Sequence, residues 1–263
     1  MGVIKINKNT SLNQIKYPPI IYKYRCWENP VHKSILTSRQ VFMAAPSSFE
    51  DKLDCKFPIR WDLLKDKDIY NYYLNYSRGH NPVSEKEHHA FARKMFQQTS
   101  VRDAKLIAEH QQGVFEEYDQ RVGILSLTAN SEIDEMWEMY ACGHSGFTVG
   151  FHSRIMFEFL GGGGEVIYVD EIPTIYPSPK HSYDEQRHYQ IFHKLSNWSF
   201  EEEYRTTIFR PDPLTKEDRI IELPPEAYQE IIIGKNMSEK NIDEIKAILA
   251  NELAHVEIKV SSV

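Results

Sequence analysis

The chain has 263 residues, of which 41% are hydrophobic and 26% are charged. This is the composition of a globular protein with enough apolar material for one sizeable core. The net charge of -7 argues against a dedicated duplex-DNA binder, because binding to the phosphate backbone requires a basic surface. The start of the sequence lacks the apolar core of a signal peptide, and no apolar run is long enough to span a bilayer. We therefore expect a cytoplasmic protein without a membrane partner.

The three cysteines, Cys26, Cys55 and Cys142, are far apart in the sequence and odd in number. No pair has the spacing of zinc ligands, and nothing in their pattern predicts a disulfide framework. His144 follows Cys142 closely, which would suit a thiol nucleophile, but a structural role is the preferred interpretation. We expect free thiols in a reducing compartment.

The first part of the chain predicts an arm followed by strands and a short helix. Residues 1–17 are polar, so we expect a flexible arm there and a single domain over residues 18–263. Apolar and polar residues alternate over residues 20–25, which predicts a strand. The pattern then predicts a helix over residues 31–38, a second strand over residues 40–44 and a turn-rich loop over residues 46–51.

The stretch from about residue 62 to residue 120 differs in composition from both of its flanks. It is rich in helix formers, Tyr and His, and Ile69, Tyr73 and Tyr76 recur at helical spacing. Ser84 followed by Glu87 is a capping box for a second helix. We predict a helical insertion that forms a lobe between two β-rich parts of the domain.

Strand-forming sequence returns after the insertion and alternates with helices unevenly. Four consecutive glycines, Gly161 to Gly164, lack the residues of a phosphate-binding loop and predict a flexible turn. This irregular order favours an α+β fold with a mixed or antiparallel sheet over regular βαβ winding. Strands are expected over residues 122–128, 146–151, 165–169, 219–222, 230–233 and 255–260, and helices over residues 134–140, 183–197 and 238–253.

The most informative segment precedes and enters an acidic strand. In an extended chain Glu203 and Arg205 share one face, and Glu201 joins them if the strand begins early enough. A carboxylate beside a guanidinium stays ionised at neutral pH, which suits a catalytic residue that stabilises positive charge. A solvated helix end, with Arg205 pairing one of the glutamates, is the alternative interpretation. Trp198 is predicted to be a structural anchor for the start of the strand.

Polar residues from three expected strands and one helix could form a nucleotide cleft. Lys23, Tyr24 and Arg25 come from the first strand, and basic side chains there would hold phosphates. Ser126 and Thr128 share a face of a central strand. Trp137 and Tyr140 lie three apart on a short helix and could form an aromatic wall for a base or a nicotinamide ring. Glu203, with Glu201, would bind a ribose hydroxyl and stabilise an oxocarbenium-like transition state without a metal.

No residue pattern predicts a metal site. The histidine pairs lack the i, i+4 spacing that places two imidazoles on one helix face. A metal-dependent nucleic-acid-processing enzyme would need acids such as Asp51, Asp54 and Glu203 to converge, and the sequence gives no reason to expect that they do.

The chain resembles a mostly bacterial family called domain of unknown function 2971, over roughly residues 20–250. This resemblance implies a cytoplasmic bacterial protein and supplies no reaction. The family more often has Asn-Asp-Pro where this chain has Glu50-Asp51-Lys52, so the resemblance gives that loop no role. The matching motifs, in order, are Tyr22-Lys23-Tyr24-Arg25, residues 35–46 with Phe49-Glu50-Asp51 and Asp54, Leu125-Ser126-Leu127-Thr128, Met136-Trp137-Glu138-Met139-Tyr140, residues 146–151, Lys194, residues 198–205, and Ile233-Gly234.

A second resemblance is to the ADP-ribosyltransferases, whose motifs are an early basic residue, a Ser-Thr strand and a late Glu-x-Glu. Arg25 or Tyr24, then Ser126 with Thr128, then Glu201 with Glu203 occur here in that order. The resemblance implies an ADP-ribosyltransferase-like sheet core and catalytic residues Glu203, Glu201 and Arg205. It also implies NAD as the substrate and a protein or nucleic-acid acceptor.

Two functions are preferred over a metal-dependent nucleic-acid-processing enzyme. The first is an NAD-dependent ADP-ribosyltransferase or NAD glycohydrolase that acts in bacterial conflict, as a toxin or in phage defence. The second is a non-catalytic nucleotide- or protein-binding module of the same fold. The first is preferred over the second.

Overall fold

The computed structural model describes residues 16–98 and 101–263. The expected flexible arm over residues 1–17 therefore lies almost wholly outside the described residues. The helices are α1 (Pro30–Thr37), α2 (Asp66–His80), α3 (Glu85–Gln97), α4 (Ala104–Arg121), α5 (Asp134–Tyr140), α6 (Ser153–Phe159), α7 (Tyr183–Phe192) and α8 (Glu239–Leu249). The strands are β1 (Ile20–Arg25), β2 (Gln40–Phe42), β3 (Val122–Thr128), β4 (Phe147–His152), β5 (Gly164–Glu165), β6 (Ile167–Val169), β7 (His193–Leu195), β8 (Glu203–Phe209), β9 (Ile220–Glu222), β10 (Tyr228–Ile233) and β11 (Glu257–Val260).

One large sheet organises the molecule, with the strand order β11-β10-β4-β1-β3-β8-β5. Only β10 and β11 pair in parallel within it, and the other neighbours are antiparallel. Two smaller pairings, β2 with β9 and β6 with β7, flank the sheet. A mostly antiparallel sheet with unevenly placed helices confirms the predicted α+β class.

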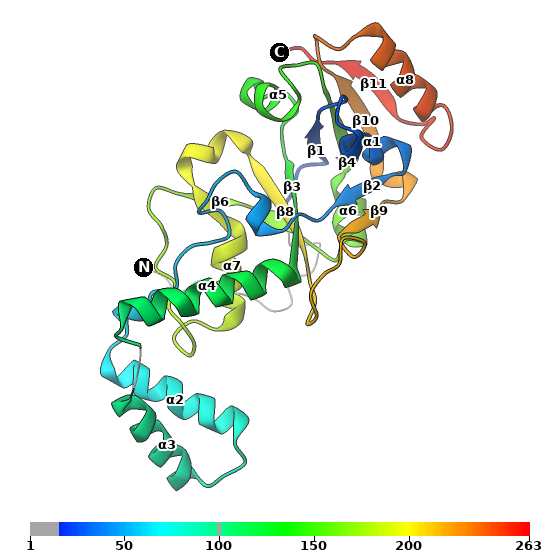
Figure 1. The fold of residues 1–263 in the computed structure, drawn as a ribbon. Coiled ribbons are helices and arrows are strands. Elements are labelled where there is room, and N and C mark those ends of the chain that lie inside the picture. Colours follow the sequence, from blue (N-terminus) through cyan, green and yellow to red (C-terminus); the bar gives the residue numbers. More distant parts are fainter. Residues whose placement is uncertain (1–15, 99–100) are drawn as a thin grey trace.

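The main hydrophobic core lies between one face of this sheet and the helices α1, α6 and α8 (Figure 1). Strand residues such as Ile21 and Val149 pack there against Leu36 of α1 and Ile245 of α8. The covering helices begin at side-chain caps: Asn29 accepts a hydrogen bond from the Val31 amide, and Ser238 accepts one from the Asn241 amide. The other face of the sheet, near α5 and α7, carries the polar residues described below.

The segment predicted as a helical insertion contains α2, α3 and α4. The capping box at Ser84 and Glu87 is present at the start of α3. Helices α2 and α3 form a hairpin that extends away from the sheet, and α4 runs from its base to β3 (Figure 1). Among the described residues of 62–120, none lies in a strand.

Several predicted elements have different bounds in the structure; the helix expected over residues 238–253, for example, ends at Leu249. The helix expected over residues 183–197 stops at Phe192, because His193 is extended and pairs with Ile167 of β6. A 3-10 helix, Ser196–Glu201, follows. The single strand expected over residues 165–169 is divided into β5, on the large sheet, and β6, which pairs with β7.

The cysteines also differ from expectation. Cys26 and Cys142 form a disulfide with their Cα atoms 5.4 Å apart, although 116 positions separate them in the sequence. Cys55 is a buried free thiol. The prediction of three free thiols was wrong because the pairing depends on the meeting of β1 and the turn after α5, which sequence spacing does not reveal.

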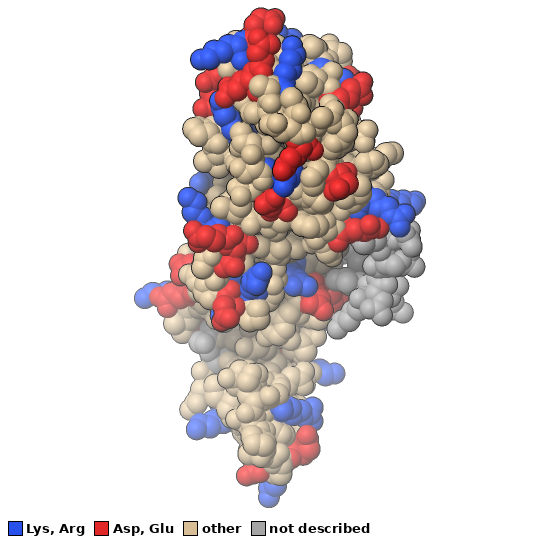
Figure 2. Space-filling view, turned by 90° about the vertical axis from the view of Figure 1, so that its right-hand side faces the viewer, with Lys and Arg blue, Asp and Glu red and all other residues tan. Residues whose placement is uncertain are grey.

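The surface carries mixed charge. On the face shown in Figure 2, the Lys and Arg side chains are interspersed with Asp and Glu side chains from the sheet region down to the α2–α3 hairpin. No helix in the described part of the chain is both long and apolar enough to cross a membrane.

Candidate functional site

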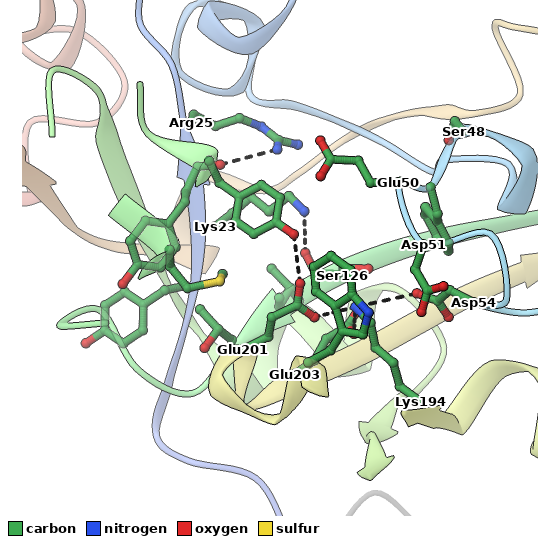
Figure 3. A pocket seen from close by; sticks show the side chains of 18 residues that line it. Lys23, Arg25, Ser48, Glu50, Asp51, Asp54, Ser126, Lys194, Glu201 and Glu203 are labelled. Atoms are coloured by element: carbon green, nitrogen blue, oxygen red, sulfur yellow. Dashed lines mark hydrogen bonds and ion pairs between the residues drawn. The ribbon is translucent and has the colours of Figure 1, made fainter. Parts of the chain in front are cut away.

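A cavity of about 260 Å³ opens beside β1, β3 and the start of β8. Strands β1 and β3 pair at one position only, Tyr22 opposite Thr128. Beyond that pair, Lys23 reaches across the gap and its ammonium donates a 2.6 Å hydrogen bond to the Ser126 carbonyl (Figure 3). The parting of two neighbouring strands thus provides the space for the cavity.

Eight of the ten residues proposed from the sequence line this cavity. They are Lys23, Tyr24, Arg25, Ser126, Thr128, Tyr140, Glu201 and Glu203. Arg205 lies behind the wall with its side chain fully buried. Trp137 does not line the cavity, so its predicted role in an aromatic wall was wrong. Its ring is fully buried against Tyr24, at 5.1 Å between ring centroids, because the inner face of α5 packs on the sheet.

Glu203 and Arg205 share a face of β8, as the alternation predicts. Arg205 Nε donates to Glu203 Oε1 at 2.7 Å and Nη2 donates to Oε2 at 2.8 Å. Burial alone would raise the pKa of Glu203, but Arg205 and Lys194 outweigh it and lower that pKa to about 2. Glu203 is therefore ionised at neutral pH. The alternative of a solvated helix end does not hold, because both side chains are buried.

Glu201 lies at the site because of its place in a 3-10 helix, which strand alternation did not predict. It ends the 3-10 helix, and Glu202 adopts a left-handed conformation, with φ 42°, before β8 begins. Glu201 accepts hydrogen bonds from Lys194 and, at 2.8 Å, from the Tyr140 hydroxyl. Burial and the neighbouring Glu203 raise the pKa of Glu201, against the opposing effect of Lys194.

Lys194 is the central cation of the wall, although no role was predicted for it. Its ammonium lies 3.4 Å from Glu203 Oε2 and 3.5 Å from Asp54 Oδ2, and it also pairs with Glu201. Burial lowers the pKa of Lys194, but these three carboxylates outweigh it and the net shift is upward. Its place among the motifs of the resemblance to domain of unknown function 2971 is a sequence signal that could have singled it out.

Lys23 and Arg25 form the opposite, basic end of the cavity. Within the described part of the chain neither forms an ion pair with a carboxylate. The Arg25 guanidinium donates a hydrogen bond to the Tyr24 carbonyl, at 3.3 Å. Burial lowers the pKa of Lys23 to about 7, with Arg25 adding to the effect, and burial lowers the pKa of Arg25 to about 10. Two poorly compensated cations facing a cavity favour an anionic ligand.

The loop after β2 supplies residues that the sequence did not assign to the site. Ser48, Phe49, Glu50, Asp51 and Asp54 line the cavity, and Figure 3 shows the Glu50 carboxylate turned toward the Arg25 guanidinium. Asp54 binds Arg205 through two contacts, at 2.8 and 2.6 Å.

Asp51, Asp54 and Glu203 therefore do converge on one cavity, contrary to our expectation. Arg205 and Lys194 hold Asp54 and Glu203. No group of three His, Cys, Asp or Glu side chains within residues 16–98 and 101–263 is arranged to hold a metal ion.

Trp198 lies in the 3-10 helix and not at the start of the strand. Its ring is half-buried, lines the cavity and has the Lys194 ammonium 4.8 Å from its centroid. The structural-anchor role therefore stays a prediction. With Tyr140 and Phe49, Trp198 provides aromatic surface beside the carboxylates.

No family model, curated protein or solved structure matches this chain. The resemblances to domain of unknown function 2971 and to the ADP-ribosyltransferases therefore stay predictions. The residues of the site place an ionised carboxylate, a second carboxylate with a raised pKa, an aromatic wall and a basic end within one cavity.

Proposed function

We propose that the cavity binds NAD and that the protein is an ADP-ribosyltransferase or NAD glycohydrolase with an ADP-ribosyltransferase-like sheet core. The observation that carries this proposal is that Arg25, Ser126 and Glu203, which are far apart in the sequence, line one cavity. Ligand cavities are commonly about 300–1,000 Å³. A cavity of about 260 Å³ suits a nucleoside-sized part of NAD, with the remainder extending beyond it.

The two ends of the cavity suit the two parts of the ligand. Lys23 and Arg25 would bind the pyrophosphate, for which cationic side chains without a carboxylate partner are well suited. Trp198 and Tyr140 would contact the nicotinamide ring, whose positive charge favours an aromatic face. The carboxylates would then lie beside the ribose.

Glu203 is the preferred catalytic residue. Loss of nicotinamide leaves an oxocarbenium-like ribose, and a carboxylate held ionised by Arg205 would stabilise that positive charge. Glu201, whose pKa is raised, would accept a proton from the water or acceptor group that attacks the ribose. Loss of the nicotinamide and gain of the acceptor need no change of oxidation state. The acceptor would be water, a protein or a nucleic acid, and the cellular role would be in bacterial conflict.

A non-catalytic nucleotide-binding module is the second candidate. It is favoured by the same ion network, because Arg205 and Lys194 occupy oxygen atoms of Glu203 that a transition state would need. In such a module the cavity would bind NAD without releasing nicotinamide.

The test measures NAD binding by calorimetry and nicotinamide release by chromatography. We expect wild type to bind NAD and release nicotinamide in the presence of a chelator, and Glu203→Gln to lose turnover much more than binding. Glu202→Gln is the matched control, because Glu202 is exposed and does not line the cavity. Binding without release by wild type would favour the module. No binding of NAD to folded protein would reject both nucleotide proposals.

A further inference from the structure

The Cys26–Cys142 disulfide connects two walls of the cavity. Cys26 directly follows Arg25 at the end of β1, and Cys142 lies two residues after Tyr140 at the end of α5. Arg25 and Tyr140 both line the cavity. The bond therefore ties the basic end of the site to the helix that carries the Tyr140 hydroxyl.

The turn on the Cys142 side is conformationally costly. Cys142, Gly143 and His144 have φ values of 52°, 60° and 61°, so three consecutive residues are left-handed and two of them are not glycine. Such residues persist only where surrounding contacts hold them. Several of the hydrogen bonds of this turn are long: the amides of Ala141, Gly143, His144 and Ser145 donate over 3.2 to 3.4 Å. The amides of Gly146 and Asn236 also donate to the carbonyls of Ala141 and His144, at 2.8 and 2.9 Å, so the disulfide acts together with these shorter bonds in fixing the turn.

Close backbone packing brings the two segments together. Gly146, just after the turn, lies so near β1 that a Cβ atom there would be 2.3 Å from the Arg25 carbonyl oxygen. Trp137 anchors the middle of α5 in the core. Release of the disulfide would remove the covalent link between the two segments while the packing of Trp137 and Gly146 remains, so its effect would be confined to the end of the helix and the turn, within residues 140–146.

The two cysteines differ in exposure. Cys142 is exposed, whereas Cys26 is only partly exposed. The thiolate of a small-molecule or protein thiol can therefore attack the Cys142 sulfur. The bond between the cysteines breaks, Cys26 leaves as a thiolate and a mixed disulfide forms at Cys142. A second thiolate then attacks the mixed disulfide. In total, two thiols are oxidised to one disulfide, and Cys26 and Cys142 gain two electrons and two protons.

We propose that this disulfide is a thiol-exchange switch that controls the α5 wall of the cavity. In the oxidised state Tyr140 is held where its hydroxyl donates to Glu201 at 2.8 Å. In the reduced state the turn relaxes, residues 140–146 become mobile and this hydrogen bond is lost for much of the time. The switch changes the shape of the cavity. The proposal therefore does not depend on which ligand the cavity binds.

The test begins with the redox state of the full chain. Protein treated with oxidised glutathione, then denatured and alkylated without reduction, should carry one alkyl group, on Cys55. Folded protein treated first with dithiothreitol should carry three. Absence of the disulfide after oxidation would overturn the proposal. So would a disulfide that resists millimolar dithiothreitol in the folded protein, because it would then be a permanent crosslink.

Hydrogen exchange distinguishes a local switch from general loss of stability. On reduction, we expect the amides of residues 140–146 to exchange at least about tenfold faster, while those of α8 and β10 are unchanged. The double variant Cys26→Ser/Cys142→Ser should show the reduced pattern under oxidising conditions. If that variant does not fold, wild type with and without dithiothreitol gives the same comparison. Unchanged exchange over residues 140–146, or an equal increase throughout the sheet, would overturn the proposal.

Discussion

Arg205 and Asp54 lie 151 positions apart in the sequence and form a buried bidentate ion pair. The distance from Nη1 to Oδ1 is 2.8 Å and that from Nη2 to Oδ2 is 2.6 Å. The same guanidinium binds Glu203 and donates to the Ile191 carbonyl at 2.8 Å. One fully buried cation therefore joins β8, the loop after β2 and the end of α7. The position of the carboxylates in the cavity depends on it.

Replacement of Arg205 by Met should destabilise the protein strongly. It leaves Asp54, Glu201 and Glu203 buried, with Lys194 as the cation that still pairs with all three. Removal of one partner from a buried ion pair typically costs about 3–5 kcal/mol of unfolding free energy. Urea denaturation at pH 7 measures this loss.

Arg154→Met is the matched control for that substitution. Arg154 forms an exposed ion pair with Glu158 one helical turn away, at 2.8 Å. Exposed pairs of this kind contribute little to stability, because solvent screens the two charges. Similar losses of stability for the two variants would show that the buried ion pairs of Arg205 do not stabilise the fold more than an exposed pair does.

Acidification should reduce stability through Glu203. Its pKa is lowered from 4.5 to about 2 on folding, so below pH 4.5 the unfolded chain binds a proton that the folded protein does not. The stabilisation is complete above about pH 4.5 and is lost as the pH falls toward 2. Glu203→Gln should flatten this part of the stability curve, measured by urea denaturation from pH 2.5 to pH 5. An unchanged slope would contradict the depressed pKa.

Glu201 should act with the opposite sign and in a higher pH range. Its pKa is raised on folding, so above pH 4.5 the folded protein holds a proton that the unfolded chain has lost, and stability falls as the pH rises. Glu201→Gln should remove this fall. Denaturation curves from pH 4.5 to pH 8 would show it, and a fall that persists in the variant would assign the effect to another group.

The two tryptophans of the site region should respond differently to truncation. Trp137 is fully buried and its indole donates to the Ser131 carbonyl at 2.9 Å, so Trp137→Ala should cost about 3–5 kcal/mol. Trp198 is half-buried in the cavity wall, so Trp198→Ala should cost much less stability and should weaken NAD binding. Thermal unfolding and calorimetry on the two variants measure both effects. A large stability loss for Trp198→Ala would instead support the role of a structural anchor that the sequence predicts.

The sequence predicted local structure well and the site only in part. The β1 and β3 strands and α5 have the bounds that periodicity indicated, and the shared face of Glu203 and Arg205 follows from strand alternation alone. Lys194 and Asp54 were missed as site residues because their positions depend on contacts between distant segments.

The sequence errors have a common physical cause. Trp137 was assigned to the aromatic wall of the cavity and Trp198 to a structural role, because an aromatic residue on a short element carries no signal of which face is buried. The disulfide was missed for the same kind of reason, since it depends on the packing of Gly146 against β1.

Anion binding at the basic end of the cavity should depend on pH through Lys23. The pKa of its ammonium is about 7 in the free protein, because burial and Arg25 disfavour the charge. A bound phosphate group would favour the charged form and raise that pKa. Affinity for NAD should therefore fall as the pH rises from about 6 to about 8.5, by up to about tenfold per pH unit.

Two substitutions at the same position separate the charge of Lys23 from its other contacts. Lys23→Arg keeps a positive charge throughout this range and should bind NAD with little dependence on pH. Lys23→Met lacks the charge and should bind weakly at every pH. Calorimetry at constant ionic strength measures the three curves. A wild-type affinity that does not change between pH 6 and pH 8.5, with Lys23→Met equally tight, would show that Lys23 does not contact the phosphates.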